Sequence, residues 1–101
     1  MHPLMTKRAL EVLQAMAKAE AENNLEDAEI VQEGGQCWVG LERISPRTVE
    51  RLLQLCLLRH EGSGGCDRYT LNEEGRRMAA DPNYVPLIDA KLRELAYALR
   101  S

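Results

Sequence analysis

The fold is decided by residues 44–56, which read ISPRTVERLLQLC. Ser45 is a good helix N-cap, and Pro46 follows at the first helical position, where its missing N–H carries no penalty. An apolar stripe then recurs at the i, i+3, i+4 and i+7 spacing of a helix face: Val49, Leu52, Leu53 and Cys56. The pattern predicts a helix that begins after Ser45 and packs one face against a core.

Downstream of Cys56, the sequence predicts a β-hairpin followed by two helices. Residues 57–61 and 66–71 are typical of strands, and Gly62-Ser63-Gly64-Gly65 between them predicts a flexible turn. Asn72 is a good cap for a helix over 73–80, which ends before Asp81-Pro82. A last helix is predicted from Leu87 to Arg100, with Ile88, Leu92, Leu95, Ala96 and Leu99 on its apolar face.

Upstream, Thr6 caps a predicted helix that runs to about Glu22 and buries Ala9, Leu10, Leu13, Met16 and Ala17. Residues 25–40 fit two interpretations. One is a short helix after Asn24 that Gly34-Gly35 stops. The other is a pair of strands, 29–32 and 36–39, joined by a turn at the same glycines. The hairpin is favoured, because four residues of this stretch prefer strands: Ile30, Val31, Trp38 and Val39.

Length and composition indicate one domain over residues 1–101 with an aliphatic core. The chain is 45% apolar and contains no phenylalanine. This balance favours helices packed on helices over a β-sandwich. The predicted class is α+β, mostly helical, with a small β-hairpin and a C-terminal helix.

Two stretches resemble the winged helix-turn-helix of MarR- and PadR-type bacterial regulators. Residues 44–53 are similar to the turn and recognition helix, and residues 68–77, RYTLNEEGRR, are similar to the last wing strand and the entry to the next helix. The resemblance spans Ile44 to Arg77 and implies a winged-helix-like fold. In this family pattern Gly75 lets a neighbouring element approach closely. Residues 36–43, where the first helix of the motif belongs, read poorly as a helix.

The resemblance implies a surface for double-stranded DNA. Arg47, Arg51 and Gln54 would face base edges in the major groove, where arginine matches guanine and glutamine matches adenine. Thr48 and the backbone N–H groups after Ser45 would hold phosphate. The hairpin would reach the DNA backbone or the minor groove through Arg59, His60 and Arg68.

The predicted function is therefore a small DNA-binding protein that regulates transcription. It would be a homodimer whose contacts come from residues 86–101, through Leu87, Ile88, Leu92, Leu95 and Leu99. The net charge is −3, although residues 41–80 hold seven arginines against six acids. The alternative is a winged-helix-like module that binds another protein and no DNA.

Other function classes find no support in the sequence. There is no nucleophile motif, phosphate loop or carboxylate pair typical of an enzyme, and no cofactor motif. His60 and Cys66 match no standard zinc spacing, so no metal site is predicted. No apolar run is long enough for a membrane span. Three cysteines, Cys37, Cys56 and Cys66, cannot all pair within one chain, which predicts reduced thiols in the cytoplasm.

Overall fold

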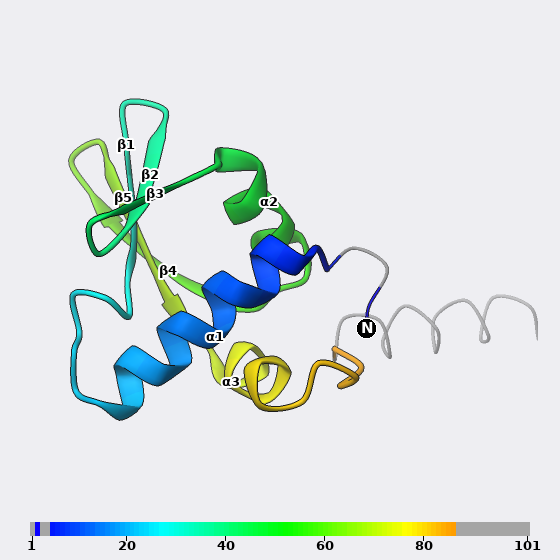
Figure 1. Ribbon diagram of the computed structural model, residues 1–101. Helices are drawn as coiled ribbons and strands as arrows, with labels where there is room; N and C mark the ends of the chain where they lie inside the picture. The colour runs from blue at the N-terminus through cyan, green and yellow to red at the C-terminus, as the bar shows by residue number, and fades with distance from the viewer. Residues whose placement is uncertain (1, 3–4, 87–101) are drawn as a thin grey trace, which may run out of the picture.

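The computed structural model describes residue 2 and residues 5–86, and it has two layers, with three helices on one side of an antiparallel sheet (Figure 1). The elements follow the chain as α1 (Lys7–Ala21), β1 (Ile30–Glu33), β2 (Gln36–Val39), β3 (Glu42–Ile44), α2 (Pro46–Gln54), β4 (Leu58–Ser63), β5 (Cys66–Leu71) and α3 (Glu73–Ala80). The strand order in the sheet is β3-β2-β1-β5-β4.

The expected fold class, winged-helix-like and mostly helical with one small hairpin, is wrong. Five strands form a single antiparallel sheet that underlies all three described helices. The segment before α2, where a helix-turn-helix has its first helix, consists instead of β2 and β3. The prediction of a hairpin within residues 25–40 is confirmed, but that hairpin is part of a larger sheet because β1 also pairs with β5.

Glycines set the tight turns between the strands. Gly34 and Gly35 join β1 to β2, with φ of 58° and 78°, and Gly64 and Gly65 join β4 to β5, with φ of 65° and 83°. Two-residue turns with both φ values positive match the twist of the strands, and glycine adopts them without steric penalty. The turn predicted over residues 62–65 is shorter than expected, since β4 continues through Ser63 and only Gly64 and Gly65 separate the strands.

The predicted caps of α1 and α2 are confirmed. The Ala9 N–H donates to Thr6 Oγ1 at 3.1 Å, and the Arg47 N–H donates to Ser45 Oγ at 3.2 Å. The buried side of α2 differs from the predicted stripe. Val49 and Leu52 are buried together with Thr48, whereas Leu53 and Cys56 are exposed.

The end of α2 explains the exposure of Cys56. Cys56 has a left-handed backbone with φ of 57°. Its N–H donates to Leu53 O at 3.0 Å, and the Leu57 N–H donates to Leu52 O at 3.2 Å. These two bonds form a Schellman motif, whose left-handed position is usually glycine. The motif ends the helical periodicity before Cys56 and leads directly into β4, so that Leu55 and Leu57 are buried on either side of it.

Asn72 and Gly75 fix α3 against the junction of α2 and β4. The Asn72 side chain accepts from the Gly75 N–H at 2.8 Å and donates to Cys56 O at 2.7 Å. Its backbone N–H donates to Leu57 O at 3.2 Å. A Cβ on Gly75 would lie only 2.3 Å from Leu57 O, so the close approach predicted for this glycine is confirmed.

The core between the layers is aliphatic, as predicted. Its largest fully buried side chains come from all three helices and the sheet: Leu13, Met16, Ile30, Leu52, Leu55, Leu57, Leu71 and Met78. Among the described residues, the helices are too short or too polar to cross a membrane. The predicted helix over 87–100 and its five proposed dimer contacts (Leu87, Ile88, Leu92, Leu95, Leu99) lie outside the described residues.

Candidate binding surface on the open face of the sheet

One face of the sheet points away from the three helices. Ile30, Cys37 and Tyr69 are buried against the helices, and alternate residues of a strand point to opposite faces. The strand register therefore defines a row of side chains on the other side that crosses all five strands: Arg43, Trp38, Val31, Arg68 and Glu61. Gln36, Glu33 and Cys66 form a second row beside it. We call these two rows the open face.

The centre of the open face is apolar and partly accessible. Val31 and Trp38 are half-buried and lie directly opposite each other on β1 and β2. Leu41, in the turn between β2 and β3, is fully exposed at 102%. A hollow of about 340 Å³ lies between Leu41, Val31, Arg68 and the loop of residues 26–29. Val31 and Trp38, with Leu41 at the margin, give this face an accessible apolar surface.

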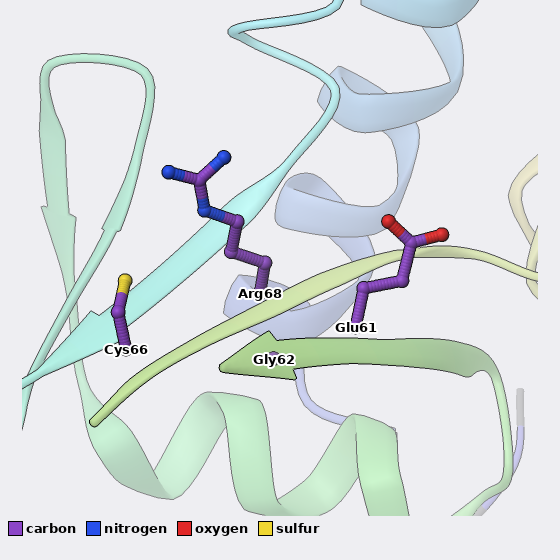
Figure 2. Close-up of a pocket in the computed structure, with 4 residues that line it drawn as sticks. All are labelled: Glu61, Gly62, Cys66 and Arg68. Atoms are coloured by element: carbon purple, nitrogen blue, oxygen red, sulfur yellow. The ribbon is translucent and has the colours of Figure 1, made fainter. Parts of the chain in front are cut away.

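A second hollow of about 380 Å³ lies toward the β4–β5 turn and is lined by Glu61, Gly62, Cys66 and Arg68. Figure 2 shows the Glu61, Cys66 and Arg68 side chains rising from the two strands toward the same side. Arg68 contributes to both hollows and therefore stands between them.

The open face and its margins carry charges of both signs. Arg68 Nη1 lies 3.7 Å from Glu29 Oε1, and Arg59 Nε lies 3.6 Å from Glu61 Oε1. Arg43 and Glu33 also belong to the open face, and Glu26 and Asp27 line the first hollow at its margin. These solvent-accessible pairs contribute little to stability, and the acids leave no excess of positive charge on this surface.

The structure divides the eight predicted DNA-binding residues among three places. Ser45, Arg47, Thr48, Arg51 and Gln54 belong to α2 and its cap, in the helical layer. Arg59 and Arg68 point to the other side of the sheet. His60 lies on the helix side of β4, where its Nε2 is 2.8 Å from Asp67 Oδ1 and its ring stacks on Tyr69. The residues therefore do not form one continuous surface, and Thr48 is buried.

Most arginines of the described residues are paired with carboxylates. Arg8 pairs with Glu42, Arg76 with Glu20 and Arg77 with Glu73, in addition to the two pairs above. Arg43 and Arg47 have no carboxylate at ion-pair distance among the residues that the structure describes. The arginine-rich segment is thus largely neutralised by neighbouring acids.

The three thiols lie in different environments. Cys37 is fully buried, and burial raises the pKa of its thiol above the ordinary value. Cys66 is half-buried at the second hollow, and Cys56 is exposed. In residues 2 and 5–86, no three histidine, cysteine, aspartate or glutamate side chains gather in a group that could hold a metal ion.

Sequence reasoning missed Trp38, Val31, Leu41 and Arg43 as surface residues. Trp38 and Val31 were used only as indicators of strand structure. Their alternation with the buried Cys37 and Ile30 was the available signal, but assigning the faces also required the pairing of β1 with β5.

Comparison of the chain with protein-family models, with curated proteins and with solved structures finds no match. The resemblance to MarR- and PadR-type regulators therefore rests on its sequence motifs alone.

Proposed function

We propose that this protein is a small, non-catalytic module that binds another protein through the open face of its sheet. The observation that carries the proposal is the row from Arg43 to Glu61, which joins an apolar centre to charges of both signs. Tryptophan and arginine are enriched at protein interfaces, where an apolar core is surrounded by polar groups. The fully exposed Leu41 lines a hollow together with Val31 and Arg68 at the margin of this face.

The balance of charge favours a protein partner over a nucleic acid. A duplex attracts proteins through its dense phosphate charge, which requires an excess of lysine and arginine on the binding surface. The open face has equal numbers of arginines and glutamates, and the chain has a net charge of −3. A partner surface of mixed charge fits this distribution. We place the module in the cytoplasm, since its three thiols are free.

A paired-variant capture experiment tests this function. The open-face variant carries Leu41→Asp and Arg68→Glu, and the control carries Arg47→Glu and Gln54→Glu on α2. All four side chains are exposed, so we expect both variants to fold. A partner identified by quantitative mass spectrometry should be recovered with the wild type and the control and be lost with the open-face variant.

Direct titration of that purified partner provides the second measurement. Trp38 is the single tryptophan of the chain, so a change in its fluorescence reports contact at the open face. Equal recovery of all partners by both variants, or binding that leaves Trp38 fluorescence unchanged, would refute the proposal.

Double-stranded DNA is the second candidate partner, with the protein acting as a transcriptional regulator. The specific observation in its favour is Arg47, which is exposed in the first turn of α2 and has no carboxylate at ion-pair distance among the described residues. In this case affinity for random duplex DNA falls steeply as salt rises, and Arg47→Ala with Arg51→Ala weakens it. Absence of binding at low salt eliminates this candidate.

A further inference from the structure

Strand β4 forms one edge of the sheet, and its backbone is set up to pair on its outer side. The Asn72 N–H donates to Leu57 O, which makes Leu57 and Asn72 a hydrogen-bonded pair of the ladder with β5. Such pairs alternate along antiparallel strands. Arg59 and Glu61 therefore direct their backbone groups toward β5. Leu58, His60 and Gly62 direct theirs toward the free edge.

The side chains of β4 are self-complementary about His60. Arg59 and Glu61 flank this residue on the same face of the strand, and both are exposed, at 72% and 55% of their side-chain surface. If a second copy of β4 runs antiparallel with His60 opposite His60, each Arg59 faces a Glu61 of the other copy. Moving the axis to Arg59 or to Glu61 instead places like charges opposite each other, which is unfavourable.

From this arrangement we propose that two copies of the chain associate edge to edge through β4, in a two-fold pairing centred on His60. The outward backbone groups of His60 then bond to those of the second copy, which joins the two sheets into one. Leu58 faces Gly62 of the second copy, where the missing side chain leaves room. Charges on an edge strand usually discourage pairing, and here they favour the register centred on His60 over those centred on Arg59 or Glu61.

This interface uses neither Trp38 nor Leu41, although it shares Glu61 with the open face. It also differs from the dimer predicted through residues 86–101. In the joined sheet the two open faces lie on the same side, because strands of one sheet share its faces.

A charge-exchange series tests the proposal by sedimentation velocity over a range of concentrations. The wild type should dimerise. Arg59→Glu alone and Glu61→Arg alone should each raise the dissociation constant by at least about tenfold, because two attractive pairs become repulsive. The double variant, with both substitutions in one chain, should dimerise like the wild type.

An equimolar mixture of the two single variants gives the most discriminating test. In the mixed dimer, the first chain presents Glu at 59 and 61 and the second presents Arg at both positions, so every opposing pair is attractive. The mixture should therefore dimerise more tightly than either variant alone. A wild type that is monomeric at millimolar concentration, single variants that dimerise normally, or a mixture without recovery would each overturn the proposal.

Backbone pairing is tested with His60→Pro against His60→Ala. Both variants lose the contacts with Asp67 and Tyr69, but only proline removes the outward N–H. Proline is tolerated on an edge strand where its N–H side faces solvent, and thermal melts of both variants verify folding. We expect dimers of the alanine variant and monomers of the proline variant. Equal association of the two would exclude pairing through this edge.

Discussion

The two faces of the sheet have opposite characters, although they are built by alternate residues of the same strands. The helix side buries Ile30, Cys37 and Leu71 under three helices. The open face presents Trp38, Val31 and Arg68 beside charged neighbours. The comparison predicts that the helix side contributes most of the stability and that the open face contributes little. Each of the following experiments tests this division.

The largest effect is expected from adjacent residues of β1. Ile30 is fully buried on the helix side, and Val31 is half-buried on the open face. Ile30→Ala should lower the free energy of unfolding by about 2–5 kcal/mol, because it removes buried surface and leaves a cavity. Val31→Ala should lower it by less than about 1 kcal/mol. Urea denaturation measures both, and equal losses would contradict the division.

A second test adds a methyl group at the close contact between α3 and the residue that precedes β4. Replacing glycine by alanine in a helix ordinarily stabilises it by about 1 kcal/mol. At Gly75 the added methyl group would meet Leu57 O, a backbone atom that cannot easily move. We expect Gly75→Ala to destabilise the protein by about 1–3 kcal/mol. A higher melting temperature for this variant would show that the close packing has been overestimated.

A third substitution removes the backbone strain at the end of α2. Cys56 is a non-glycine residue in the left-handed position that ends α2. Cys56→Gly should stabilise the protein by about 0.5–1 kcal/mol, because glycine adopts this conformation without steric penalty. Cys56→Ala is the control, since it removes the thiol and keeps the strain. If alanine stabilises as much as glycine, the backbone is not the cause.

The smallest effect is expected from the ion pairs. One pair on the helix side and one on the open face are compared for their contribution to stability. Arg76 binds Glu20 with two nitrogens, at 2.5 and 3.3 Å, and joins α3 to α1. Hydrogen bonding to Glu20 raises the pKa of Arg76. The open-face pair of Arg68 with Glu29 is longer, at 3.7 Å. We expect Arg76→Ala to lower stability by about 0.5 kcal/mol and Arg68→Ala to leave it unchanged within error. The reverse order in thermal melts would argue against the comparison.

Local signals in the sequence predicted most individual elements. Pro46 after Ser45 located the start of α2, and Asn72 located the start of α3, because caps act within one helical turn. The glycine pairs located two turns. Strand β3 was missed because Glu42–Ile44 is only three residues long and supplies one buried side chain.

The assembly of the sheet could not be predicted in this way. The pairing of Ile30 with Tyr69 joins segments on either side of α2, and no local pattern encodes it. Without this pairing the open face could not be defined, so Trp38 was interpreted only as a strand former. The predicted DNA-binding residues came from a linear motif, and the structure separates them because α2 and the outward side of β5 lie on opposite sides of the sheet.

The pairing of β1 with β5 also has a consequence for folding kinetics. The other strand pairs are hairpins closed by two-residue turns, which form on a microsecond timescale. The β1–β5 pair forms only after the chain has closed a long loop that contains α2, which is an entropically slower event. The sheet therefore consists of two local units that form fast, residues 30–44 and 58–71. The β1–β5 pairing that joins them forms slowly. Hydrogen exchange of the backbone amides between β1 and β5 should therefore report the opening of the whole molecule, while amides of the outer strands exchange by local fraying.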